Sequence, residues 1–158
     1  MAASDYFLKI DGIPGESTDS KHKDEIELVS FSWGVAESVV QGGGGGRAGA
    51  RPQFRDFELT KRLDKASPQL FLATASGKHL KEATLSVRKA GKAQLEYLKI
   101  KLTDVLVTSL HQTGEGDVPS EVVSFAFEKI ELQYTQQTAR GTGAVYKAGW
   151  DLSRNLKL

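Results

Sequence analysis

An alternation of apolar and polar residues, repeating every second position, runs through most of this 158-residue chain. It is plain in residues 5–11, where Tyr6, Leu8 and Ile10 share one parity. Successive side chains of a strand point to opposite faces, so this period indicates β-strands that bury one face. The same pattern predicts further strands over residues 25–36, 54–60, 83–89, 94–110, 121–136 and 144–154. The chain is therefore expected to be mainly β.

Three of these segments carry more specific expectations. Residues 25–36 place large apolar side chains at odd positions and small ones at even positions, which predicts one strand with a packed face and a small, partly polar face. Residues 94–110 and 121–136 exceed the usual strand length of about 3–10 residues. We expect the first to break near Thr103–Asp104 and the second to bend or bulge.

One helix is predicted over about residues 68–76. Ser67 can cap it, Pro68 suits its first turn, and Gly77 suits the left-handed residue past its end. The run Leu70–Ala73 is wholly apolar, so we expect burial on more than one side of the helix. Two interpretations stay open: the helix plugs the end of a barrel, or it lies at a subunit interface.

Many strands with a single helix favour a β-barrel or a β-sandwich. No linker divides the sequence, so residues 1–158 are expected to form a single domain. The formal net charge is only +1, which argues against recruitment by nucleic acid or anionic lipid. The chain has no cysteine, so it offers no thiolate metal ligand, disulfide or cysteine nucleophile. Its start shows no cleavable signal peptide and no stretch is apolar enough to span a membrane.

No pattern of a catalytic, cofactor or metal site emerges. The three histidines, His22, His79 and His111, are far apart, and we expect each to be a solvated loop residue. The acid pairs Glu25/Glu27 and Asp56/Glu58 are best explained as solvated strand faces. The glycine run lacks the residues that complete a phosphate-binding loop.

The basic residues do not predict a nucleic-acid site either. Arg47, Arg51 and Lys61–Arg62 make only a weak basic cluster, without interleaved aromatic side chains. Trp33 and Trp150 are interpreted as core anchors rather than platforms for a ligand.

Several motifs, in order along almost the whole chain, resemble the haemolysin-coregulated protein (Hcp) family. They are F-L-K-I-D-G-I-P-G-E-S, S-F-S-W-G-V-A-E-S, D-K-A-S-P-Q-L-F-L-A-T-A-S-G-K-H, L-S-V-R-K-A-G with E-Y-L-K-I-K-L, F-A-F-E-K-I-E-L-Q-Y, and G-W-D-L-S-R-N. The resemblance implies a compact β-barrel of two sheets with one flanking helix. It also implies a non-enzymatic subunit, without cofactor, of the inner tube of a bacterial type VI secretion system.

Members of that family form homohexameric rings that stack into a tube. The resemblance implies partners of three kinds: a spike protein at the tip, a contractile sheath around the tube, and small effector proteins inside it. It also implies that the chain resides in the bacterial cytoplasm before the apparatus fires. The chain is then secreted to the medium or a target cell without a cleaved signal peptide.

Two segments are candidates for this assembly. We expect the long loop of residues 40–51 to dock on the adjacent ring, through Gly42, Gly43, Gly44, Gly45, Gly46, Arg47 and Arg51. The alternative is a disordered surface loop. Ser30 and Ser32 are candidates for the inner wall of the ring, against the alternative of an ordinary exposed face. A different function also stays open, that of a monomeric β-barrel binding a small molecule in its lumen.

Overall fold

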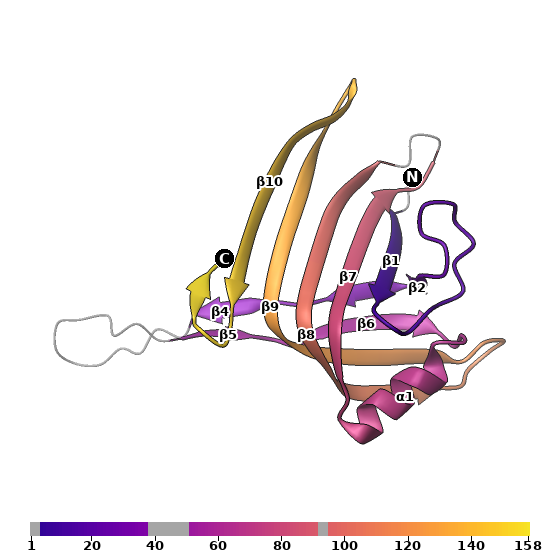
Figure 1. The fold of residues 1–158 in the computed structure, drawn as a ribbon. Coiled ribbons are helices and arrows are strands. Elements are labelled where there is room, and N and C mark those ends of the chain that lie inside the picture. Colours follow the sequence, from indigo (N-terminus) through magenta and orange to yellow (C-terminus); the bar gives the residue numbers. More distant parts are fainter. Residues whose placement is uncertain (1–3, 38–50, 92–94) are drawn as a thin grey trace.

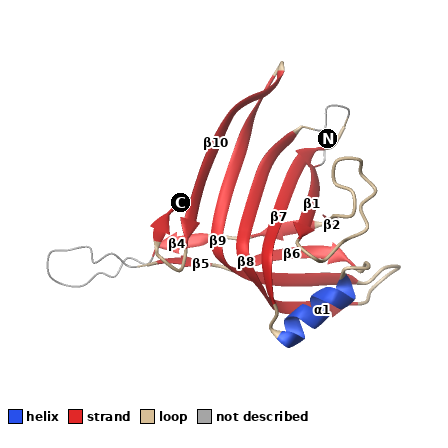
Figure 2. Ribbon diagram, viewed as in Figure 1, coloured by secondary structure: helices blue, strands red, loops and turns tan. Residues whose placement is uncertain are grey.

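The computed structural model describes residues 4–37, 51–91 and 95–158, which form strands and, within these ranges, one helix. The mainly β class and the single flanking helix are confirmed (Figure 2). The elements are β1 (Ser4–Ile10), β2 (Ile26–Leu28), β3 (Ser30–Ser32), β4 (Val35–Glu37), β5 (Pro52–Phe54), β6 (Phe57–Arg62), α1 (Ser67–Ser76), β7 (His79–Lys89), β8 (Glu96–Thr113), β9 (Ser120–Thr138), β10 (Gly141–Asp151) and β11 (Leu156–Lys157).

The strands form one antiparallel nine-stranded sheet, folded into two layers, and a separate β4–β5 ribbon. The main path runs β11-β10-β9-β8-β7-β1-β2, while β6 pairs with β9 and β3 pairs with β6. The expected barrel is not closed by hydrogen bonds between the described strands. At Val29 the chain passes from β2, which pairs with β1, to β3, which pairs with β6, and the Val29 N–H donates to the Thr60 carbonyl oxygen. The chain itself thus links the two layers there, and β1 does not pair with β6.

The two long strands β8 and β9 connect the layers. The first part of β9 pairs with β6, and its second part pairs with β10, so the strand bends from one layer into the other (Figure 1). The expected bend in this segment is therefore confirmed. The expected break in β8 is wrong: the strand continues through Asp104, which has a positive φ of 53°, and its register with β9 shifts between Val107 and Ser109. A bulge absorbs the curvature without ending the strand.

The predicted single strand over residues 25–36 is also wrong, because the chain changes its pairing partner twice there. Its three short pieces, β2, β3 and β4, pair with β1, β6 and β5 in turn. Val29 and Val35, expected on the packed face, are 56% and 51% exposed. Alternation along the sequence cannot reveal such a change of partner.

The helix begins one residue earlier than predicted, and Gly77 follows it with φ 67°, as its C-cap role requires. Ser67 is not the N-cap: Ala66 holds that position, and the Ser67 hydroxyl donates to Glu121 instead. Within the single chain, burial of the helix is limited to the side that packs on β8, and Phe71 and Leu72 are 61% and 64% exposed. Burial of its other side at a subunit interface stays a prediction.

The hydrophobic core lies between the two layers. Its largest fully buried apolar side chains come from both, and include Leu8, Ile26, Phe57, Leu59, Leu70, Leu85, Ile100, Leu102 and Phe125. Stacked rings of Phe31, Phe57 and Phe125 run across β3, β6 and β9. The candidate surfaces lie outside this core, one on the outward face of the layer that contains β3 and β6, and one beside the β4–β5 ribbon.

Candidate assembly surfaces

Ser30 and Ser32 are exposed, on the outward face of the β3–β6–β9–β8 layer. Residues opposite each other across antiparallel strands share a face, so the pairing register extends this surface beyond β3. We call it the hydroxyl face. It comprises Ser30, Ser32, Glu58, Thr60, Ser109, His111 and Val122, with the buried Ser124 opposite Glu58 and Ser109. The structure thus places the two predicted serines on one face with the hydroxyl groups of Thr60 and Ser109, which are far from them in the sequence.

The loop with the predicted ring-stacking residues is held at its base by the β4–β5 ribbon. Val35 pairs with Phe54 and Glu37 with Pro52, which brings the two ends of the loop side by side. Arg51 precedes β5 and is exposed. Gly42, Gly43, Gly44, Gly45, Gly46 and Arg47 lie outside the described residues.

An apolar groove of about 500 Å³ lies beside this ribbon. Its wall is formed by side chains of β4, β5, β9 and β10 with the segment between β3 and β4, chiefly Trp33, Val35, Phe54, Leu132, Ala148 and Trp150. Both tryptophans pack against the core, as predicted, and they also line this open surface. The buried Nε1 of Trp150 has no hydrogen-bond partner within residues 4–37, 51–91 and 95–158. Such an apolar surface is typical of a place where another molecule packs.

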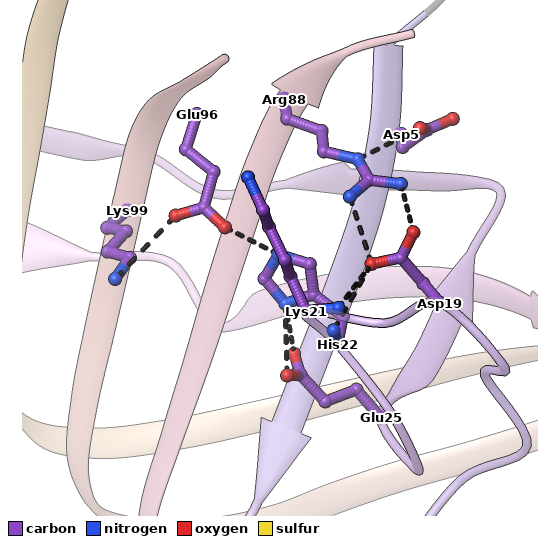
Figure 3. Close-up of polar contacts among 8 residues, drawn as sticks. All are labelled: Asp5, Asp19, Lys21, His22, Glu25, Arg88, Glu96 and Lys99. Carbon is purple, nitrogen blue, oxygen red and sulfur yellow. Dashed lines mark hydrogen bonds and ion pairs between the residues drawn. The ribbon is translucent and has the colours of Figure 1, made fainter. Parts of the chain in front are cut away.

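His22 is not a solvated loop residue: it is 5% exposed and links the segment between β1 and β2 to β8 (Figure 3). Its ring stacks on Phe7 with centroids 4.4 Å apart. Nδ1 lies 3.0 Å from a Glu25 carboxylate oxygen, and Nε2 lies 2.5 Å from Glu96. Glu25 therefore does not belong to a solvated face.

Arg88 of β7 fastens the same segment at a second point (Figure 3). Its Nη1 and Nη2 donate to both carboxylate oxygens of Asp19, at 2.9 and 2.6 Å, and its Nε donates to Asp5. The hydrogen bonds from Arg88 lower the pKa of Asp19 to about 2, from an ordinary 3.8. The guanidinium also lies 4.8 Å from the centre of the Phe7 ring. Sequence reasoning missed this network because its partners are far apart along the chain and follow no local spacing.

Lys61 does not belong to a basic surface cluster. It is fully buried, and its Nζ lies 2.6 Å from Glu121 and 2.7 Å from Asp64. Ser67 joins the same group, since Lys61 donates to its hydroxyl and that hydroxyl donates to Glu121. Burial raises the pKa of Glu121, but hydrogen bonds from Lys61, Gln112 and Ser67 outweigh it and hold the pKa below its ordinary value. These contacts join β6, β9 and the start of α1.

The other two histidines lie on strands rather than in loops. His79 begins β7 and its Nδ1 is 2.9 Å from Asp104, while His111 is exposed on β8. Across the part of the chain that the structure describes, no group of three His, Cys, Asp or Glu is arranged to hold a metal ion. No helix in that part is long and apolar enough to cross a membrane.

Comparison with known proteins agrees with this architecture. The family described as "Type VI secretion system effector, Hcp" matches residues 7–134. The protein named hcp1 of Pseudomonas aeruginosa is 39% identical over 160 residues, which cover 98% of this chain and 99% of that protein.

Solved structures match over the same span. Hcp1 from Salmonella typhimurium has a TM-score of 0.83 at 36% identity, with all of both chains covered. A structure described as a type six secretion system protein reaches a TM-score of 0.91 at 30% identity, covering 99% of this chain and 100% of the other. By family match, sequence identity and fold, the chain belongs to the Hcp family of type VI secretion proteins.

Proposed function

We propose that the chain assembles into homohexameric rings, that the rings stack into the inner tube of a type VI secretion apparatus, and that effectors travel inside them. The apolar groove carries this proposal. A folded chain that leaves Trp33, Phe54 and Leu132 around an open groove gains stability when a neighbouring copy covers them. A contact between two different surfaces of identical subunits closes into a ring if the rotation permits.

The hydroxyl face is proposed as the inner wall of the ring. Short hydroxyl side chains such as Ser30, Ser32 and Thr60 offer hydrogen bonds to a passing protein without a large apolar surface that would retain it. Glu58 adds one exposed negative charge to each copy. The stacking contact is proposed for the loop with Gly42 to Gly46, Arg47 and Arg51, where glycine permits close approach of two backbones.

A monomeric barrel that holds a small molecule in its lumen finds less support. Phe57, Phe125 and Leu8 fill the space between the layers, and the strands in residues 4–37, 51–91 and 95–158 do not close the sheet. Catalysis of its own is not part of the proposal. We further propose that the chain resides in the cytoplasm until the apparatus fires and needs no cleaved signal peptide. The spike protein, the sheath and small effectors are its proposed partners.

The mass of the purified protein in solution tests ring formation. Light scattering after gel filtration should give about six times the 17.2 kDa of one chain, and negative-stain microscopy should show rings with a central hole. A monomer at all accessible concentrations would refute the proposal.

Stacking and transport need separate tests. Deleting residues 43–48 should leave the rings intact and prevent tubes, so normal tubes would disprove the role of this loop. Replacing Ser32 by lysine should reduce the secretion of effectors while the variant itself is still secreted. The control is Ser20→Lys, which is exposed in the segment between β1 and β2, outside the hydroxyl face. Equal effector secretion by the two variants would contradict the assignment of the inner wall.

A further inference from the structure

Residues 15–25, between β1 and β2, lie across the outward face of the layer that contains β1, β7 and β8 (Figure 3). Phe7 and Arg88 point to that face, since their neighbours Leu8 and Val87 belong to the core. Phe7 and Arg88 are nevertheless each only 4% exposed, because residues 15–25 pack over them. We call residues 15–25 the strap.

The backbone hydrogen bonds of the strap join its two halves to each other. The N–H groups of Gly15 and Ser17 donate to the carbonyl oxygens of Asp24 and Glu25, at 2.7 and 3.0 Å, and the Asp24 N–H donates back to Ser17 at 2.8 Å. These bonds give the strap its shape but do not hold it to the sheet. Side chains provide its attachment to β7 and β8.

The strap is attached to the sheet at two points, which differ in how they depend on protons. A guanidinium stays protonated at every pH that a folded protein meets, so Arg88 holds Asp19 from weakly acidic to alkaline pH. The second point is His22, which stacks on Phe7 and reaches Glu96 of β8. An imidazole in water titrates at about pH 6.5, so this second attachment is the one that pH can change.

Both ring nitrogens of His22 face a carboxylate (Figure 3). Nδ1 lies 3.0 Å from an oxygen of Glu25, and Nε2 lies 2.5 Å from an oxygen of Glu96. A neutral imidazole has one N–H and one bare nitrogen, and an ionised carboxylate can only accept. A neutral ring would therefore set its lone pair against those of one carboxylate. A second proton removes this conflict, and an imidazole binds that proton more firmly than a carboxyl group does.

Other charged groups surround the ring, and none of them replaces this proton. They come from the strap, β1 and the turn after it, β7 and β8, and are Asp19, Lys21, Lys9, Asp11, Lys81, Glu82, Arg88 and Lys99. Lys99 lies 3.7 Å from Glu96, and Asp19 accepts from the backbone N–H of His22 rather than from its ring. Lysine, arginine and carboxyl groups ordinarily keep their charge between about pH 6 and pH 9. The imidazole is thus the group in this cluster that changes charge in that range.

We propose that His22 is a pH-dependent latch. While its ring carries both protons, it fastens the strap to β8; when one proton is lost to water at alkaline pH, that end of the strap is released and Phe7 is uncovered. Because the folded chain favours the charged ring, the contribution of the latch is complete below the pH at which a free imidazole titrates and is lost as the pH rises. The latch does not depend on ring formation, so it stands or falls separately from the proposed function.

Amide hydrogen exchange of the full chain, followed by mass spectrometry at about pH 6 and pH 9 and corrected for intrinsic rates, measures the opening of the strap. In the wild type the protection of residues 15–25 should fall by about tenfold or more between the two pH values, as expected for losing hydrogen bonds to charged groups. Glu96→Gln should keep its protection at both, because the amide NH2 can donate to the bare nitrogen of a neutral ring. The control His111→Gln, at an exposed histidine of β8, should behave as the wild type.

Two results of the exchange experiment would overturn the latch. One is a wild-type strap that is equally protected at both pH values, and the other is a Glu96→Gln strap that loses protection as the wild type does.

NMR of the wild-type chain labelled with nitrogen-15 histidine supplies an independent measurement that needs no stable variant at alkaline pH. The His22 signals, identified by their absence in His22→Gln, should report two protonated ring nitrogens at about pH 6 and one at about pH 9. A bare ring nitrogen at pH 6 would refute the latch.

Discussion

Lys61 and Glu121 form an ion pair whose side chains are both 0% exposed, with Nζ and Oε2 2.6 Å apart. Replacing Lys61 by methionine preserves the length of the side chain but leaves the Glu121 carboxylate buried without its cation. Removing one partner of a buried pair costs about 3–5 kcal/mol of unfolding free energy. For a chain of this length that lowers Tm by roughly 6–20 °C.

Urea unfolding followed by circular dichroism and tryptophan fluorescence measures the effect. The matched control is Lys65→Met, an exposed lysine nearby, which should change the unfolding free energy by less than about 0.5 kcal/mol. The double variant Lys61→Met/Glu121→Leu should recover most of the loss, because apolar replacement of a whole buried pair is often neutral or stabilising. The reasoning fails if Lys61→Met unfolds with the wild type, or if the double variant is no more stable than the single one.

The same pair gives a dependence on pH. The pKa of Glu121 lies below its ordinary value of 4.5 in the folded chain. The ionised carboxylate therefore stabilises the fold fully above that ordinary value, and the contribution is lost as the pH falls through the lower folded-state pKa. Without Lys61, the loss should begin at a higher pH, which acid titration of the two proteins can compare.

Two further predictions concern the segment between β1 and β2. The pKa of Asp19 is about 2, so the contribution of its ionised carboxylate to stability should be complete above pH 3.8 and disappear as the pH falls toward 2. In Arg88→Gln, the pKa of the Asp19 carboxyl, measured by NMR titration, should rise back toward 3.8. An unchanged pKa in this variant would rule out Arg88 as the cause. In Gly15→Ala, the new Cβ would lie 2.5 Å from the backbone oxygen of Glu25, which cannot move aside as a side chain can. We expect the variant to lose about 1–3 kcal/mol of unfolding free energy, measured by thermal unfolding. The control Gly34→Ala, whose new Cβ would lie 3.9 Å from the Arg55 side chain, should lose clearly less, and equal losses would contradict this account.

Local patterns predicted the elements whose formation depends on neighbours in sequence. The helix lies within one residue of its expected bounds because Pro68 and Gly77 act on their own backbone. Most strands were found because alternation with a period of two is a local property. The segment that became β2, β3 and β4 was misread, since its partners β1, β6 and β5 are chosen by the whole fold.

The candidate surfaces, too, were predicted only as far as they depend on local sequence. Ser30 and Ser32 stood out because small polar residues alternate with large apolar ones, but their neighbours on the hydroxyl face come from β6, β8 and β9. The positions of His22 and Lys61 were predicted wrongly. Their partners Glu96 and Glu121 lie 74 and 60 residues away, respectively, and no spacing in the sequence reports such distances.

The sequence by itself determined a mainly β chain with one helix, and its ordered motifs indicated the family to which it belongs. The secondary structure and the family motifs could both be recognised because each depends on residues that are close together in the sequence. Only the tertiary structure decided that the described strands leave the sheet open, that Phe71 and Leu72 face solvent, and that an apolar groove lies beside the β4–β5 ribbon. Whether an apolar residue is buried depends on which distant segment of the chain packs over it. Alternation along the sequence indicates only that one face of a strand is apolar, and not what covers that face.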